Sequence, residues 1–388
     1  MAGIYIHIPF CKQKCHYCNF FSLSSRKNQP ELLEALKKEA ERSRSYLAGQ
    51  LIHTIYFGGG TPTIYPAEKL QEVLETILVN HPAQPAEITL EINPEDVSKE
   101  YVEALKNTGF NRFSIGIQSF FEKDLLWLNR GHSAVQAESA VYRLQDEGYH
   151  NISIDLIYGI PSLDPGQWEK NVERALALKV PHISAYSLTV EPYTALDILI
   201  RKGKLERPSE EASIRHFKMI REMLKSAGYL HYEISNFALP GFESMHNSNY
   251  WNGTHYLGLG PSAHSFNGIS RQWNVSRLDD YLTKNHTGQP CFEIETLTSE
   301  QRYNEYVMTS LRTSRGCDSQ KLSDLFPFRK AEDHSQENSR FQKATKKLIE
   351  RDLLREENGI FFLTDEGQLL ADGVAAELFL SSDRDRSL

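Results

Sequence analysis

The sequence predicts an α/β protein, in which an incomplete (βα)6 barrel of the TIM type precedes an aromatic-rich connector and a small helical C-terminal domain. Three observations predict this fold. Short stretches rich in β-branched and aromatic residues alternate with helix-like stretches over about the first 235 residues, which is typical of parallel strands joined by outer helices. The next region is crowded with aromatic residues, glycine and asparagine. After about residue 298 the pattern becomes helical again.

The six strands are expected where short apolar stretches can be buried on both faces of a parallel sheet. Six units suit an incomplete barrel better than a closed barrel of eight. The strands are predicted at residues 3–8, 54–57, 87–92, 112–118, 151–158 and 182–189.

Helices are expected between and after these strands. Glycines at positions 109, 148 and 228 stand just past three of the predicted helices, where a left-handed residue commonly ends a helix. The helices are predicted near residues 31–47, 67–79, 98–107, 121–128, 134–147, 166–178 and 209–227.

We predict three domains, at residues 1–235 (core barrel), 236–298 (connector) and 299–388 (C-terminal domain). In the last, helices at 300–312 and 341–351 precede a hairpin at 353–363 that turns at Asn358–Gly359, and another helix starts at Asp365. This order is similar to a winged-helix module. The acidic chain favours a docking or structural role for it over DNA contact. The tail 381–388 is predicted to be disordered.

Composition excludes several classes of protein. With 388 residues and 40% hydrophobic residues, the chain can pack a core and is not a disordered chain. The net charge of −8 argues against a protein built to hold nucleic acid. No run of 18 apolar residues predicts a membrane span, and the N-terminus lacks the basic flank of a signal peptide. We therefore expect a cytoplasmic protein.

The cysteines are concentrated at one place. Cys11, Cys15 and Cys18 form a C-x3-C-x2-C motif directly after the first predicted strand, whereas the two others are isolated. Thiolates suit both zinc and iron–sulfur clusters. Zinc would need a fourth ligand, which His7 or His16 could supply. A [4Fe–4S] cluster on three thiolates would leave one iron open to a small molecule. The spacing leaves both metals open.

Other candidate residues follow the later strands. The run Gly58-Gly59-Gly60-Thr61-Pro62 follows the second strand, where three glycines let the backbone approach a ligand closely. Because ligands of barrel folds bind at the carboxyl ends of strands, polar side chains there are candidates for the same site. Taken singly, each could also be a buried, paired polar residue. These candidates are Glu91 and Gln118, which end the third and fourth strands, Asp155 within the fifth, Arg130 twelve residues after Gln118, and Tyr17 just before the last cysteine.

The cysteine motif after the first strand of a βα barrel resembles the radical S-adenosylmethionine (SAM) superfamily. The resemblance implies a [4Fe–4S] cluster on Cys11, Cys15 and Cys18, with SAM chelating the open iron. It also implies contacts to SAM from the glycine loop and from the polar residues at the strand ends, with a tyrosine packed on adenine. The residues so implied are Tyr17, Gly59, Gly60, Thr61, Glu91, Gln118, Arg130 and Asp155.

Motifs along nearly the whole chain narrow the resemblance to the oxygen-independent coproporphyrinogen III oxidase family. They are YIHIPFCKQKCHYC, FGGGTPT, LEINPE, RFSIGIQSF, SIDLIYGIP and SAYSLTVEP. The match to this family implies that two more residues bind SAM. They are Tyr5, which stands six residues before the first cysteine, and Thr189.

Two departures point to the heme chaperone branch of that family. Phe20 stands where the oxidase has a fourth cysteine, and the sequence starts at its first strand without the oxidase's extension. The branch also carries an H-N-x-x-Y-W motif, which is intact from His246 to Trp251. A histidine can ligate heme iron, and Tyr250 and Trp251 offer flat faces for a porphyrin. The alternative for these residues is ordinary packing.

The resemblance therefore implies heme as cargo, acceptor hemoproteins at the membrane, and a homodimer, with no nucleic-acid partner. It also implies a cytoplasmic protein that can associate peripherally with the inner face of the membrane. Two alternatives stay open. One is coproporphyrinogen III oxidation by radical SAM chemistry, and the other is a zinc-stabilised barrel that binds another ligand. The isolated Cys291 and Cys317 are expected to act as small buried hydrophobes.

Overall fold

The computed structural model describes residues 1–326 and 331–380, with side chains described outside residues 331–339; the predicted disordered tail lies beyond them. The chain divides into two compact units. The first consists of Met1–Leu230, Ser235–His246 and His255–Ile294, and the second of His231–Ile234, Asn247–Thr254 and Glu295–Leu388. No helix in the described part of the chain is both long and apolar enough to cross a bilayer.

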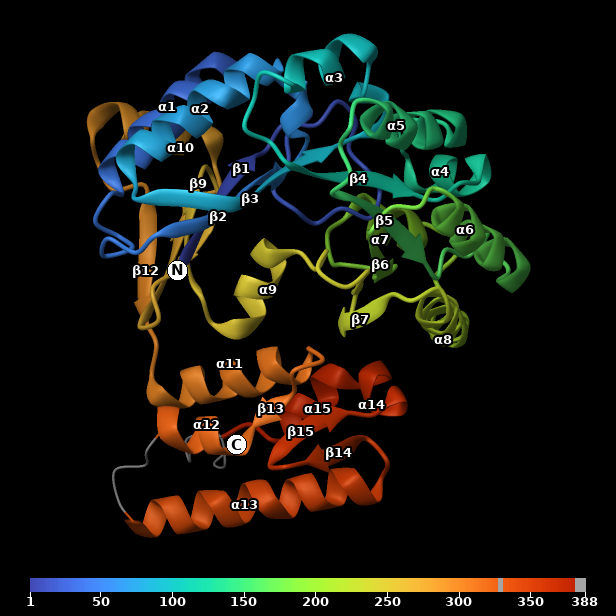
Figure 1. Ribbon diagram of the computed structural model, residues 1–388, viewed down its shortest axis with the longest axis vertical. Coiled ribbons are helices and arrows are strands. Elements are labelled where there is room, and N and C mark those ends of the chain that lie inside the picture. The colour runs from blue at the N-terminus through green and yellow to red at the C-terminus, as the bar shows by residue number, and fades with distance from the viewer. Residues whose placement is uncertain (327–330, 381–388) are drawn as a thin grey trace. The chain divides into compact units, whose positions relative to one another are not determined.

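A curved sheet is the centre of the first unit (Figure 1). Its first six strands pair in parallel and in sequence order, as the alternation of strands and helices predicts. These strands are β1 (Ala2–Ile8), β2 (Ile52–Gly59), β3 (Ala83–Ile92), β4 (Arg112–Gln118), β5 (Ile152–Tyr158) and β6 (His182–Ser187).

The barrel is incomplete, as predicted, because β1 and β6 do not pair with each other. β1 instead pairs in parallel with β9, and β6 pairs with β8 in antiparallel fashion. The full strand order is β12-β11-β10-β9-β1-β2-β3-β4-β5-β6-β8-β7. The added strands are β7 (Leu230–Glu233), β8 (Asn236–Ala238), β9 (His255–Leu259), β10 (His264–Phe266), β11 (Ser270–Asn274) and β12 (Phe292–Thr296).

The two faces of the six parallel strands differ in chemistry. Side chains alternate along a strand, and one set, which includes Ile4, Phe57 and Leu90, is apolar and fully buried. The alternate set contains polar residues, such as Glu91 and Asp155, that line a cavity inside the barrel. The sheet therefore packs one face against helices and turns a polar face toward the site.

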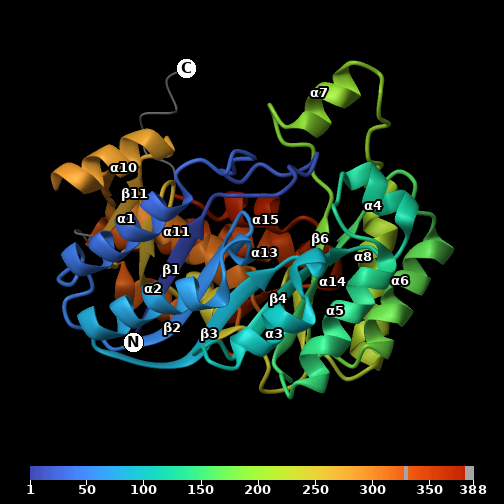
Figure 2. The ribbon, with the colours of Figure 1, turned by 90° about the horizontal axis from the view of Figure 1, so that it is seen from above.

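Helices cover the outer face of this sheet (Figure 2). Capping boxes start two of them, at Ser133 with Gln136 and at Asp164 with Gln167. The crossover elements are α1 (Gln29–Arg42), η1 (Pro62–Ile64), α2 (Ala67–Asn80), η2 (Pro94–Asp96), α3 (Lys99–Leu105), α4 (Glu122–Leu128), α5 (Ala134–Asp146), α6 (Pro165–Ala177), α7 (Ala195–Arg201) and α8 (Glu210–Ser226).

Several features differ from the sequence prediction. α1 ends at Arg42 rather than near residue 47, and Ala48 and Gly49 have positive φ values of 49° and 73° in the turns that follow. Within the predicted connector, the structure has α9 (Met245–Asn252) and α10 (Leu278–Thr287), neither of which is among the helices predicted from the sequence. α9 was missed because it buries only one residue and has no apolar periodicity.

The second unit has a core of its own, with Val307, Cys317 and Leu348 fully buried in it. The predicted hairpin is confirmed: β14 and β15 pair around Asn358 and Gly359, whose φ values of 54° and 79° suit a tight turn. Its elements are α11 (Ser299–Leu311), β13 (Cys317–Asp318), α12 (Ser319–Leu325), α13 (Ala331–Glu350), β14 (Leu354–Glu357), β15 (Ile360–Leu363), α14 (Asp365–Leu369) and α15 (Ala371–Glu377).

Candidate functional site

The three clustered cysteines lie on a loop that is fixed at both of its ends. Its base closes where the Cys11 amide donates to the Leu23 carbonyl at 2.9 Å and the Leu23 amide donates to Pro9 at 2.6 Å. In the middle of the loop, the His16 amide donates to the Leu128 carbonyl at the end of α4, at a distance of 3.1 Å. The His16 ring also contacts this end of α4. The loop therefore presents its thiols in one orientation at the end of β1.

These thiols open into a cavity of about 400 Å³ at the carboxyl ends of the parallel strands. The cavity gathers nearly all of the residues predicted from the sequence, from seven separate segments of the chain. Those that line it are Cys11, Cys15, Tyr17, Cys18, Gly59, Gly60, Thr61, Glu91, Gln118, Arg130, Asp155 and Thr189. These residues lie around one barrel mouth, as expected. Their roles in binding stay predictions.

The three thiols of the motif are not gathered around a single point. Burial raises the pKa of Cys11 and Cys18, and the other thiols of the motif raise both values further, so an uncompensated set of thiolates is unfavourable. Among the described residues, no group of three or more His, Cys, Asp or Glu side chains is arranged to hold one metal ion. A [4Fe–4S] cluster binds each thiolate through a different iron, so it needs no such convergence.

The histidines considered as zinc ligands have other partners. Nε2 of His7 lies 2.9 Å from the Phe21 carbonyl, and Nδ1 lies 3.0 Å from the Tyr5 hydroxyl. Nδ1 of His16 lies 2.9 Å from the Trp127 carbonyl. These contacts give both rings a structural role in fixing the loop.

Each of the three glycines at the end of β2, where Gly58 and Gly59 close the strand and Gly60 follows it, is required by a close contact. A Cβ on Gly58 would lie 2.8 Å from the Glu91 carboxyl group, and one on Gly60 would lie 2.6 Å from the Phe10 carbonyl oxygen. Gly59 has a φ of 109° and faces the His7 ring. The Gly60 and Thr61 amides donate to Ile8 and Phe10 at 2.7 Å, so this loop supports the segment that leads into Cys11.

Two partly buried carboxylic acids face the cavity. Glu91 accepts hydrogen bonds from the Tyr56 hydroxyl at 2.7 Å and from the Gly59 amide at 3.0 Å. Burial raises the pKa of Glu91 to about 7 and that of Asp155 to about 6, and the charge of Asp155 adds to the shift at Glu91. A cationic ligand in the cavity would favour their charged forms.

Arg130 connects the cysteine loop with the strand ends. Its guanidinium donates to Cys15 Sγ at 3.3 Å, to the Asn93 side chain at 2.7 Å and to the Gly116 carbonyl at 2.7 Å. Its Nε is buried and has no partner among the described residues. An orphaned buried donor in a cavity indicates an absent acceptor, for which a ligand carboxylate is suited.

The remaining predicted residues take different positions around the cavity. Gln118 is buried at the end of β4 with a left-handed φ of 69°. Burial raises the pKa of Tyr17, which therefore stays neutral. Thr189 follows β6, which ends at Ser187 rather than at residue 189 as expected; the Leu188 amide still donates to the Tyr158 carbonyl of β5 at 2.9 Å.

Two predicted site residues do not line this cavity. Tyr5 is on β1, and its hydroxyl lies 3.0 Å from Nδ1 of His7. His246 is 1% exposed at the start of α9; its Nδ1 lies 2.9 Å from Thr54 Oγ1 and its ring stacks on Tyr56 at 5.1 Å. Burial lowers the pKa of His246 to about 3. In this structure its ring is covered, so ligation of heme iron by His246 requires α9 to move.

Sequence reasoning missed some polar residues of the cavity. Asn93 donates to Thr61 Oγ1 at 3.0 Å and accepts from Arg130, so it ties three parts of the site together. It directly follows β3 in the LEINPE motif and could have been chosen by position. Ser114, whose hydroxyl lies 3.4 Å from Asp155, could have been found by its alternation with Gln118 along β4.

The comparisons with known proteins agree with this site. Residues 5–175 match the Radical SAM superfamily, and residues 297–370 match the HemN C-terminal domain. The heme chaperone HemW of Bacillus subtilis (strain 168) is 33% identical over 381 residues, which cover 96% of this chain and 98% of that protein. The heme chaperone HemW of Lactococcus lactis is 34% identical over 384 residues, covering 98% and 97%.

A solved structure shares the fold along nearly the whole chain. The structure of coproporphyrinogen III oxidase (HemN) from Escherichia coli, described as a radical SAM enzyme, superposes with a TM-score of 0.83. It covers 97% of this chain and 90% of that chain at 22% sequence identity, so it shows the fold alone. The sequence matches at 33% and 34% identity show that the chain belongs to the HemW heme chaperone family within the radical SAM superfamily.

Proposed function

We propose that this protein is a heme chaperone, which binds heme and, with a [4Fe–4S] cluster and SAM, delivers it to acceptor hemoproteins. The observation that carries the proposal is the near-full-length match to proteins named heme chaperone HemW, at 33% identity over 96% of the chain. Membership of the radical SAM superfamily implies the cluster and SAM as cofactors.

Cys11, Cys15 and Cys18 would hold the cluster. When bound, the cluster supplies electrons and an open iron for the amino and carboxylate groups of SAM. The thiols bind it as thiolates, which the charge of Arg130 beside Cys15 stabilises.

The other cavity residues would bind and orient SAM. The Nε of Arg130 is placed to donate to the SAM carboxylate, and Glu91 and Asp155 supply acceptors and negative charge. Gly59, Gly60 and Thr61 bring the backbone close to the methionyl part. Gln118 and Thr189 contribute polar groups, Tyr17 a ring for adenine, and Tyr5 a hydrogen bond that orients His7.

Heme would be bound in part by the motif from His246 to Trp251. Tyr250 and Trp251 are partly exposed, so their rings could contact a porphyrin. His246 would become an iron ligand only after its ring leaves Thr54 and Tyr56. We also infer acceptor hemoproteins at the membrane, a peripheral association there, and a homodimer, from the family resemblance alone.

Binding of SAM should tighten as pH rises. Glu91, with its pKa near 7, is mostly protonated at pH 6 and charged at pH 8, and Asp155 extends the effect to lower pH. A cationic ligand favours the charged acid, so binding releases a proton, and affinity should rise by up to about tenfold per pH unit below pH 7. Anaerobic calorimetry from pH 5.5 to 8.5 measures this.

The control for the pH dependence is Glu91→Gln, which cannot titrate. Its SAM affinity should be lower at pH 8 and should depend less on pH than that of the native protein. Because SAM titrates equally in both experiments, the difference between the two curves belongs to Glu91. Parallel curves would show that Glu91 does not face the cation.

Heme titration under anaerobic conditions tests the proposed function. Cluster-loaded protein should shift the Soret band of heme and saturate at a fixed stoichiometry, and His246→Ala should alter the band if this histidine is the iron ligand. The same preparation should not decarboxylate coproporphyrinogen III. Absence of heme binding together with decarboxylation would replace the chaperone by the oxidase.

A further inference from the structure

The second unit contains a pocket of about 190 Å³ that the proposed cofactor site does not use. It lies where the segment around Ile234 meets the end of α11 and the β14–β15 hairpin. Its polar lining includes Arg312, Arg355, Ser314 and Gln368. All of its residues belong to the second unit, so the pocket is complete within that unit.

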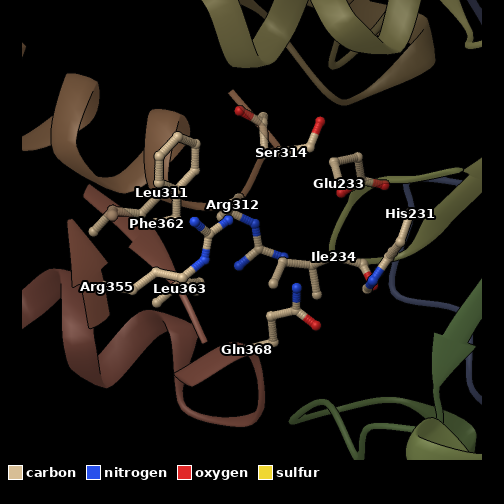
Figure 3. A pocket seen from close by; sticks show the side chains of 11 residues that line it. His231, Glu233, Ile234, Leu311, Arg312, Ser314, Arg355, Phe362, Leu363 and Gln368 are labelled. Carbon is tan, nitrogen blue, oxygen red and sulfur yellow. The ribbon is translucent and has the colours of Figure 1, made fainter. Parts of the chain in front are cut away.

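The two arginines of this pocket converge. Figure 3 shows the guanidinium groups of Arg312 and Arg355 directed into the same space, with the amide of Gln368 beside them. Each guanidinium is supported by an aromatic ring: that of Arg312 lies 5.3 Å from the centroid of Trp251, and that of Arg355 lies 4.4 Å from the centroid of Phe362. These rings orient the two cations before any ligand arrives.

Two polar atoms of the pocket are buried without a partner. They are the Nε of Arg312 and the Oε1 of Gln368, neither of which has a hydrogen bond among the described residues. Buried polar atoms are nearly always satisfied in folded proteins. Rotating the Gln368 amide by half a turn would exchange its oxygen for a donor. An oxyanion between these groups would then accept from both.

The charge of the pocket also favours an anion. Two arginines and one glutamate line it, which leaves a formal charge of +2 − 1 = +1. Glu233, the glutamate, lies toward His231 and away from the guanidinium groups in Figure 3. The present ionic partners of the arginines are surface carboxylates, Asp372 and Glu357, with side chains 84% and 62% exposed. Such exposed pairs are weak and can yield to a better-placed anion.

We propose that this pocket binds a carboxylate group, and that the carboxylate is a propionate of heme; the second step rests on the proposed function. The pocket is smaller than the ~300–1,000 Å³ of sites that enclose a whole ligand, so it would take one end of a larger molecule. Leu311, Leu363 and Phe362 add apolar surface for the adjoining edge of a porphyrin. Trp251, under Arg312, belongs to the same motif as His246.

The test compares heme with its dimethyl ester, in which both propionates are neutral. The full-length, cluster-loaded native protein should bind heme about 10- to 100-fold more tightly than the ester. This ratio is expected because the ester cannot form the charge-assisted hydrogen bond that a propionate accepts. Arg312→Gln and Arg355→Gln should each weaken heme binding about tenfold and leave ester binding nearly unchanged. The matched control is Arg351→Gln, since Arg351 pairs with Glu377 and does not line the pocket.

The ratio of the two affinities separates the pocket from general damage to the fold, because a misfolded variant loses both ligands together. A native protein that binds heme and ester equally, or arginine variants that keep the native ratio, would overturn the proposal while the heme chaperone function stands. A variant that keeps the native circular dichroism spectrum and melting temperature yet loses both ligands equally counts against the pocket as well. If the native protein bound no heme, the proposed function itself would fail, and the inference with it.

Discussion

Cys15→Ser should remove the cluster almost completely after anaerobic reconstitution. Serine keeps the size of the side chain but replaces a soft thiolate ligand with a hydroxyl, and one of only three protein ligands is lost. The hydrogen bond from Arg130 to Sγ would be weakened at the same time. The measurement is the iron and sulfide content per chain, with the visible absorption of the reconstituted protein.

The control for this result is Cys291→Ser. Cys291 is buried between Glu39 and Asn274, far along the chain from the motif, and its thiol does not reach the cavity. This variant should reconstitute like the native protein. Native iron and sulfide content in Cys15→Ser would show that the ligand assignment is wrong, and one zinc per colourless chain would favour the zinc-stabilised barrel.

Arg130→Gln should weaken SAM binding by about 100-fold. The change removes the charge and the buried Nε donor that we assign to the carboxylate of SAM, and charge-assisted hydrogen bonds of this kind contribute about 1.5–3 kcal/mol. Loss of the contacts to Asn93 and Gly116 should add to the effect. Anaerobic calorimetry on protein with verified cluster content gives the affinity.

Arg143→Gln is the matched control for Arg130. Arg143 donates to the Val97 carbonyl from α5 and lies outside the cavity, so its replacement should leave SAM affinity unchanged. Arg130→Lys should not restore binding, because an ammonium cannot reproduce the planar set of donors. Native SAM affinity in Arg130→Gln would place the SAM carboxylate elsewhere.

The sequence predicted most of the site because the site follows from strand ends. Once the parallel strands are located, Glu91, Gln118 and Asp155 must come to one edge of the sheet, and the loop after β1 must come there too. The three glycines were recognisable for the same reason, although only the structure shows that Gly58 is required by Glu91 and Gly60 by the Phe10 carbonyl.

What could not be predicted depends on contacts between distant segments. The place of His246 is set by Glu87, which lies 159 positions earlier and accepts the His246 amide at 2.9 Å, and such a carboxylate stabilises the start of α9. No local pattern encodes that contact. The arginine pocket of the second unit was missed likewise, because Arg312 and Arg355 belong to separate elements that meet only in the folded domain.

Phe20 separates the two functions considered for this fold. It is 66% exposed and lines the rim of the cysteine cavity, at the position where the oxidase has its fourth cysteine. A phenylalanine supplies apolar surface and no ligand. The cavity therefore keeps the three thiols implied for the cluster, while the residue that would mark the oxidase is absent from this position.

Heme transfer tests the central claim most directly. Cluster-loaded protein carrying heme is mixed anaerobically with an excess of an apo-cytochrome. At intervals the two proteins are separated, and the Soret spectrum of each is recorded. The account predicts that heme leaves the chaperone and appears in the cytochrome in near-stoichiometric amount. Heme that stays bound, or a protein that instead decarboxylates coproporphyrinogen III without carrying heme, would contradict it.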